Sequence, residues 1–181
     1  MHLEQLNLSY LISEDRIVLK IGFSLAEHEE IKKEIQVFLT RRMLKKMWPT
    51  LMEAISAHMR INRPEAAFAS DELVEMEREN ALNAMRDGGN FDQAYDDVQR
   101  ESVHGTKPLL LDRIQFHLKL NEAFWIQFFP QEGGTIDLKL ETPLLHGFCK
   151  LLIDAEKSSD WDLQLTLPSS EQLHIPAHRL N

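Results

Sequence analysis

The chain has 181 residues, of which 43% are hydrophobic and 27% are charged, proportions typical of an ordinary soluble globular protein. No stretch approaches the roughly 20 consecutive apolar residues that a membrane span requires, and no secretory signal is visible at the N-terminus. The net charge of -9 disfavours binding to nucleic acid or to anionic lipid. The single cysteine, Cys149, fits a reducing compartment, so we expect a cytoplasmic protein.

Three strands followed by a helix are expected in the first part of the chain. Alternating apolar residues predict the strands at 6–12, 17–23 and 35–39. From Met43 to Met59 the apolar residues instead recur as pairs four positions apart, which indicates an amphipathic helix. Thr40 is suited to cap the start of that helix. Pro49 interrupts it, so we expect either a kink or two short helices that abut.

The middle of the chain carries most of the excess negative charge. Between Glu65 and Lys107 there are eleven acidic and four basic residues, a net charge of -7. Ser70 to Asp87 predicts a helix that ends at two glycines, and Phe91, Tyr95 and Val98 have the spacing of a second, short helix. Because strong hydrophobes are few, this segment is expected to be either lightly docked or partly disordered.

A second set of strands and a helix follows the acidic segment. The strands are predicted at 113–120, 124–129 and 136–140, with a last one at 163–167. The stretch 124–129 is apolar on both faces and should be the most buried strand, with Trp125 in the core as Trp48 is in the first half. Thr142 is expected to cap a helix that starts at Pro143.

The two halves therefore repeat a β-β-β-α pattern. The expected fold is α+β in a single domain over 1–181: an antiparallel sheet of about six or seven strands with two amphipathic helices on one face. The expected parts are a first unit, an acidic helical insertion, a second unit with its final strand, and an irregular tail: 3–62, 63–108, 109–168 and 169–181.

Four cations lie on one side of the first helix: Arg41, Arg42, Lys45 and Lys46. Such a face can bind phosphate or nucleic acid, since arginine pairs offer bidentate contacts. It can also hold the acidic segment of the same chain, or it can simply be the solvated side of an amphipathic helix, which is the interpretation the sequence favours.

A second candidate surface is the polar face of the predicted sheet, where Arg113, His117 and Lys119 alternate with apolar residues. This alternation predicts that the outer sheet face is either a shallow polar groove or an ordinary solvated surface. No metal site is expected. Glu101 and His104 have the Glu-x-x-His spacing but lack the second motif that a di-iron site needs, and Pro176 separates His174 from His178.

The sequence contains no recognisable catalytic motif and predicts no cofactor. This disfavours an enzyme without excluding one, because catalytic residues often meet only in the fold. We expect a non-catalytic cytoplasmic accessory or interaction protein that acts through protein contacts, as a homodimer or with another protein. The alternative is a phosphate-ligand or nucleic-acid binder that uses the cationic helix. An enzyme with a site on the polar sheet face comes third.

Overall fold

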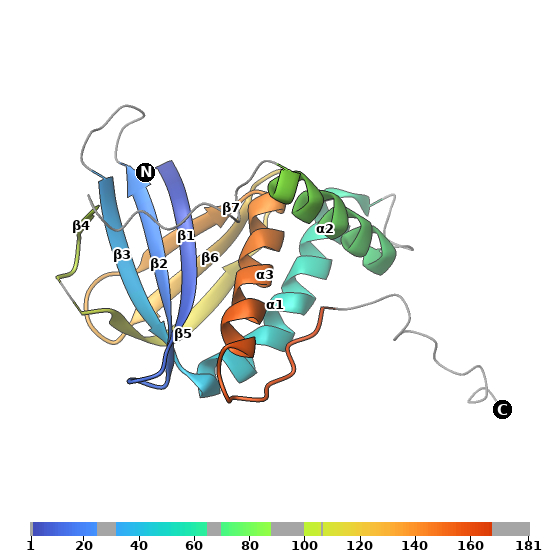
Figure 1. Ribbon diagram of the computed structural model, residues 1–181. Coiled ribbons are helices and arrows are strands. Elements are labelled where there is room, and N and C mark those ends of the chain that lie inside the picture. The colour runs from blue at the N-terminus through green and yellow to red at the C-terminus, as the bar shows by residue number, and fades with distance from the viewer. Residues whose placement is uncertain (1, 25–31, 65–69, 88–99, 106, 168–181) are drawn as a thin grey trace.

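A computed structural model describes residues 2–24, 32–64, 70–87, 100–105 and 107–167. Within these residues the protein has the expected α+β class, with seven strands in one sheet and three helices (Figure 1). The order of the strands along the sheet is β1-β2-β3-β5-β6-β7, and the short β4 pairs with β3 beside this path.

The first three strands form an antiparallel group: β1 (His2–Leu11), β2 (Arg16–Ser24) and β3 (Lys32–Leu39). In β2 the apolar residues at alternate positions are fully buried, as at Ile17, Leu19 and Ile21. Burial of one face fixes the register, because a slip by one residue would turn that apolar set to solvent. The three strands predicted for this part of the chain are confirmed.

The second antiparallel group consists of β5 (Leu109–His117), β6 (Phe124–Pro130) and β7 (Ile136–Leu140). Phe124, Ile126 and Phe128 are fully buried. The expectation that β6 is buried on both faces is wrong: Trp125 lies on the outer face, partly exposed, and its Nε1 donates to Asp137 Oδ1 at 3.0 Å. The indole nitrogen needs an acceptor, and the outer face provides one.

The two groups are joined by a parallel pair, so the sheet is mixed and not wholly antiparallel as expected. Val37 lies opposite Leu109 and Phe38 opposite Leu110, and β4 (Arg100–Ser102) runs parallel to the start of β3. Parallel neighbours need a long crossover connection, which here contains two helices. Alternation in a sequence reports which face of a strand is buried and says nothing about the direction of its neighbour.

The sequence predicts a capping residue for two of the three helices, and one of these two predictions is confirmed. The helix α1 (Arg41–Asn62) begins where predicted, because the Thr40 hydroxyl accepts a hydrogen bond from the Met43 amide at 3.2 Å. Pro49 lies inside this single continuous helix and does not divide it. The helix α3 (Thr142–Lys157) has Glu141 at its N-cap, so the prediction of Thr142 as the cap is wrong by one residue.

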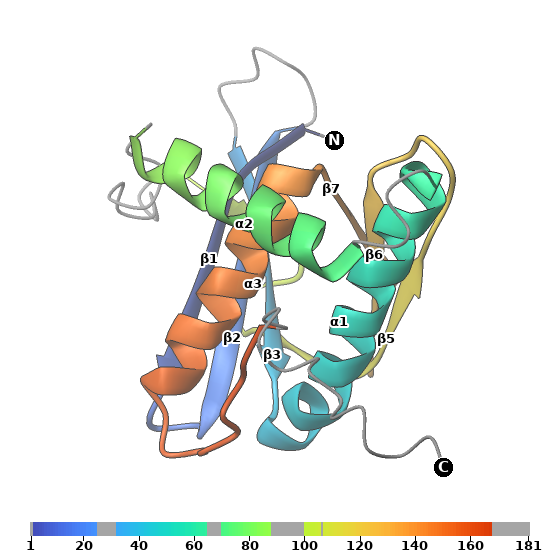
Figure 2. The same cartoon turned by 90° about the vertical axis from the view of Figure 1, so that its right-hand side faces the viewer.

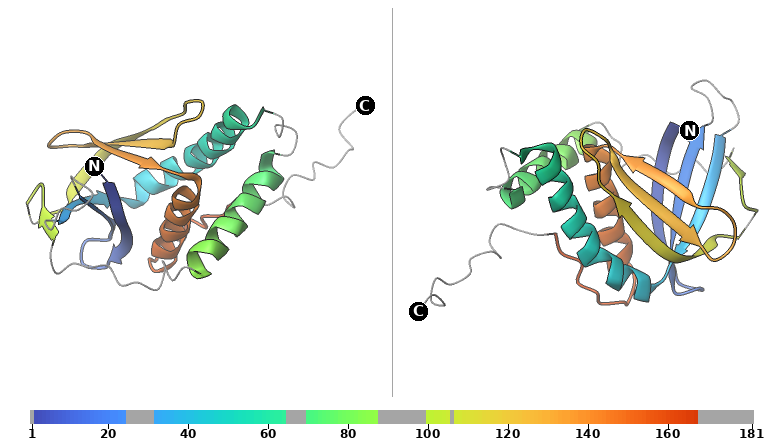
Figure 3. Two further views of the ribbon diagram at one scale, coloured as in Figure 1. Left: turned by 90° about the horizontal axis from the view of Figure 1, so that it is seen from above. Right: turned by 180° about the vertical axis from the view of Figure 1, so that it is seen from behind.

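The helix α1 contacts β5, and the helix α3 contacts both β1 and β7 (Figure 2). At the end of α1, the His58 ring meets Phe124 of β6 edge to face, with centroids 5.5 Å apart. Close by, Asn62 Oδ1 accepts a hydrogen bond from the Asn121 amide. The helix α3 contacts β1, and the strands of the two groups run in clearly different directions around the helices (Figure 3).

The helix α2 (Ser70–Asp87) contacts both α1 and α3 and lies across α3 in Figure 2. It corresponds to the first helix predicted in the acidic segment. The second one, predicted from Phe91, Tyr95 and Val98, lies outside the described residues, as does the tail from 168 onward. No helix in the described ranges is long and apolar enough to cross a membrane.

The last predicted strand, at 163–167, is not a strand. Asp162 and Gln164 both have φ of 51°, a left-handed conformation that breaks the extended backbone. The Leu163 amide instead donates to the buried carboxylate of Glu156 at 2.7 Å. Trp48 of α1 holds the end of this segment, because its Nε1 donates to the Thr166 carbonyl at 3.0 Å.

Candidate functional site

The side chains of all four cations of α1 are exposed. Arg42 and Lys46 lie opposite the buried residues of the helix, whereas Arg41 lies on the same side as the buried Trp48, seven residues later. Residues four apart stack on an α-helix, so Arg41 and Lys45 form one ridge. Arg42 and Lys46 form a second ridge, about 100° further round the helix. The sequence pattern predicts all four on one side of the helix, opposite the apolar stripe, and does not reveal that the two ridges adjoin different surroundings.

Arg42 and Lys46 line a cavity of about 520 Å³ between α1 and β5. Arg41 and Lys45 instead line a hollow of about 410 Å³ beside Trp48 and the segment from Asp162 to Leu165. The fold thus divides the predicted cationic face into two pairs. Only the first pair lies beside the sheet.

The cavity between α1 and β5, called here the α1–β5 groove, is lined by apolar side chains, called here its apolar floor, and by polar side chains. Its apolar lining comes from both elements: Met43, Met47, Leu110, Leu111, Ile114 and Phe116. Its polar lining consists of Thr40, Arg42, Lys46, Thr50, Asp112, Arg113 and Gln131. With three cations and one carboxylate, the groove has a net charge of +2 in a chain whose overall charge is -9.

The three cations of the groove differ in their contacts. The guanidinium of Arg113 lies over the ring of Phe129, 4.0 Å from the ring centre, and is therefore already engaged. The side chains of Arg42 and Lys46 make no ion pair or hydrogen bond with any described residue. The groove therefore offers two cationic side chains that form no ion pair with a described carboxylate, next to buried and half-buried apolar side chains.

Of the residues predicted for the polar sheet face, Arg113 and His117 lie on β5, whereas Lys119 lies after the strand, which ends at His117 and not at 120 as expected. All three contact neighbouring side chains. His117 stacks on Trp125 with ring centroids 4.1 Å apart, and its Nε2 lies 3.2 Å from Gln127 Oε1. Lys119 pairs with Glu122 at 3.3 Å. Together with Arg113 on Phe129, each of the predicted residues already has a partner on its own surface. Arg113 also lines the α1–β5 groove, whereas His117 and Lys119 do not.

A second polar cavity, of about 260 Å³, lies where the end of α1 meets the start of α3, and the sequence analysis did not predict it. It is lined by His58 and His146, with Asn62 and Glu141 beside them. His146 is 3% exposed, and burial lowers its pKa to about 4. Burial also lowers the pKa of His58. The signal lies in the spacing: His146, Cys149 and Ile153 are at i, i+3 and i+7, on the apolar stripe of α3.

No metal site was expected, and the described residues contain no cluster of three or more histidine, cysteine or acidic side chains that could hold an ion. Glu101 lies on β4, so the Glu-x-x-His spacing with His104 is not on a helix. His174 and His178 lie outside the described part of the chain. Cys149 is fully buried, and burial raises the pKa of its thiol to about 12, which suits an inert core residue.

Comparisons with known proteins add no functional information. No protein-family model matches the sequence, and searches of curated proteins and of solved structures return no match. The geometry of the α1–β5 groove is therefore the basis for a functional proposal.

Proposed function

We propose that this is a non-catalytic interaction protein that binds an acidic segment of a partner protein in the α1–β5 groove. The observation that carries the proposal is the position of Arg42 and Lys46. They adjoin the same apolar floor, and their side chains form no ion pair with any described carboxylate. Unpaired cations next to apolar surface favour a ligand that brings both carboxylates and hydrophobic side chains.

The apolar floor favours a protein segment over a phosphate ligand. Met43 and Met47 supply flexible, polarisable side chains that adapt to different apolar partners. A phosphate or a nucleic-acid backbone would leave this floor without a partner, and the overall charge of -9 would repel it at long range. An acidic segment is repelled in the same way, but it recovers free energy by burying its apolar residues.

We assign the occupant to a different protein and not to a second copy of this chain. The chain's own acidic stretch, with a net charge of -7 between Glu65 and Lys107, includes α2, which packs against α1 and α3, and β4, which pairs with β3. Self-association through that stretch would require these elements to leave their positions. Sedimentation equilibrium over a range of protein concentrations distinguishes these partners, because only self-association raises the measured mass.

Fluorescence anisotropy with three labelled probes tests the proposed ligand class. The probes are a decapeptide of alternating glutamate and leucine, the matching decapeptide of alternating lysine and leucine, and a single-stranded oligonucleotide. We expect saturable binding of the acidic peptide alone. Its affinity should fall only modestly between about 0.05 and 0.5 M salt, because apolar burial contributes to it.

Preference for the oligonucleotide, with a steep salt dependence, would favour the phosphate-binding alternative. Equal affinity for the two peptides would mean that the groove does not discriminate between acidic and basic ligands. Either result contradicts the proposal.

A further inference from the structure

One edge of β5 lacks a strand neighbour over most of its length. The parallel pairing of β3 with β5 consists of Val37 opposite Leu109 and Phe38 opposite Leu110. Immediately afterwards β3 ends at Leu39 and the chain turns into α1, whereas β5 continues to His117. From 111 to 117 the described residues pair with β6 on one side of β5 and with no strand on the other.

The α1–β5 groove opens on this edge. Side chains alternate between the two faces of a strand, so a cavity that lies over one face touches every second residue. The groove is instead lined by five consecutive residues of β5, from Leu110 to Ile114. The β-bulge between Leu111 and Arg113 accounts for part of this run, because it interrupts the alternation of faces. Since the opposite side of β5 pairs with β6, backbone N–H and C=O groups of alternate residues point away from the sheet on the side that adjoins α1.

The position next to this edge is the one that β3 would fill if it continued as a strand. The first turns of α1 border that position, and its lining residues include Thr40, Met43 and Met47. An uncovered strand edge is a template for pairing with another chain. Here it lies between an apolar floor and the cations Arg42 and Lys46, which select what can pair.

From this geometry we infer that the acidic segment binds as an added β-strand along 111–117 of β5. This inference rests on the proposed function and names the binding mode. Backbone hydrogen bonds to β5 hold the segment, and alternate side chains give specificity. A segment in which acidic and apolar residues alternate suits strand addition, because successive side chains of a strand point to opposite faces. The apolar side chains can then contact the apolar floor while the acidic side chains stay near Arg42 and Lys46. Five added residues span about 17 Å.

Backbone methylation of the peptide separates this mode from a helical or irregular one. In an added strand only every second residue turns its N–H toward β5, and the intervening N–H groups point to solvent. The glutamate-leucine decapeptide is therefore made in two methylated forms, one N-methylated at its glutamates and one at its leucines. We expect one form to bind at least roughly tenfold more weakly and the other to stay within about twofold of the parent.

Hydrogen exchange of the protein supplies an independent readout. When the unmethylated peptide binds, alternate amides within 111–117 should exchange more slowly, while the amides of β7 at the far side of the sheet serve as the control. Protection confined to α1, with β5 unchanged, would contradict strand addition.

The two proposals fail in different ways. If the peptide binds in a manner that requires Arg42 and Lys46, but both methylated forms bind alike, strand addition is wrong and the proposed function stands. If the double substitution R42Q/K46Q leaves peptide binding unchanged, the groove is not the site and both proposals fail.

Discussion

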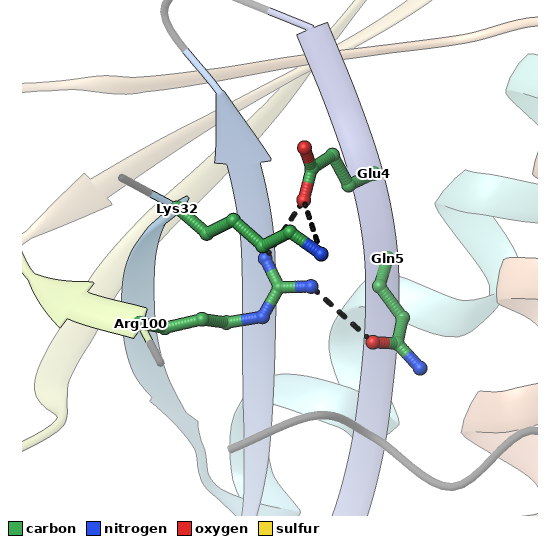
Figure 4. A network of polar contacts seen from close by, with 4 residues as sticks. All are labelled: Glu4, Gln5, Lys32 and Arg100. Atoms are coloured by element: carbon green, nitrogen blue, oxygen red, sulfur yellow. Dashed lines mark hydrogen bonds and ion pairs between the residues drawn. The ribbon is translucent and has the colours of Figure 1, made fainter. Parts of the chain in front are cut away.

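The guanidinium of Arg100 lies against the backbone of β2 at Gly22, in the space that any larger side chain at that position would occupy. From β4 it reaches across β3 and β2 to β1, where it contacts Glu4 and Gln5 at 3.3 Å each (Figure 4). Lys32 of β3 also contacts Glu4, at 3.9 Å. Because the Arg100 side chain is only 3% exposed, these contacts are shielded from solvent.

The first prediction concerns this contact. Gly22→Ala should lower the free energy of unfolding by about 1–3 kcal/mol, because the added methyl group displaces the guanidinium from its partners. Urea denaturation measures the change. In an Arg100→Ala background the same substitution should be neutral or slightly stabilising, since alanine costs less conformational entropy than glycine in a strand. If Gly22→Ala changes the free energy of unfolding equally in the wild type and in Arg100→Ala, the two substitutions are additive, and Arg100 is not the reason that position 22 requires glycine.

The second prediction concerns the pH dependence of stability. Burial lowers the pKa of His146 from 6.5 to about 4, so the folded protein keeps this ring neutral at a pH where the unfolded chain binds a proton. The ring has no effect on stability well above pH 6.5. As the pH falls from 6.5 toward 4, the free energy of unfolding should decrease by up to about 3 kcal/mol on this account.

Denaturation of His146→Gln across this pH range tests the assignment. The variant should have a flatter profile between pH 6.5 and 4 than the wild type. The remaining slope should reflect other groups, among them His58, whose pKa burial also lowers. Arg78, from the neighbouring α2, opposes protonation of His146 as well, so Arg78→Gln should raise the pKa of the folded His146 and make the loss of stability between pH 6.5 and 4 slightly smaller. Identical profiles for wild type and His146→Gln would show that another group is responsible.

The third prediction compares two tryptophans. Trp48 is 7% exposed and lies between α1 and the segment that ends at Thr166. Trp48→Ala should therefore lower the free energy of unfolding by about 3–5 kcal/mol. Trp125 lies partly exposed on the outer sheet face. Trp125→Ala should lower the free energy of unfolding distinctly less, by roughly 1–2 kcal/mol. Acrylamide quenching gives a second measure, because Trp161 is also buried and Trp125 should dominate the quenched fluorescence. Equal costs for the two substitutions would contradict this placement of Trp125.

Local chemistry in the sequence predicted the elements of the fold well. Alternation located the strands because one face of each is buried, as Ile17, Leu19 and Ile21 illustrate. Thr40 marked the start of α1 because a threonine hydroxyl suits the free amides of a first helical turn. These signals need no knowledge of distant residues.

The sequence-based predictions were wrong where residues far apart in the chain determine the local structure. Trp125 was assigned to the core from its apolar character, but its hydrogen bond to Asp137 belongs to the outer face. Leu163 and Leu165 alternate like a strand, yet their backbone is fixed by Glu156 and by positive φ at Asp162 and Gln164. The groove combines Arg42 with residues of β5 that follow about seventy positions later, so no local pattern could reveal it.

The most direct test of the central claim is a matched comparison of two double variants on the same helix. R42Q/K46Q removes the two cations that line the α1–β5 groove, and R41Q/K45Q removes two cations that line the other hollow. Both change the net charge equally, and glutamine keeps a similar helix propensity. We expect the affinity for the glutamate-leucine decapeptide to fall at least roughly tenfold in R42Q/K46Q and less than about twofold in R41Q/K45Q. Equal losses in the two variants would show that only the general positive charge of α1 matters, and would contradict a binding site in the groove.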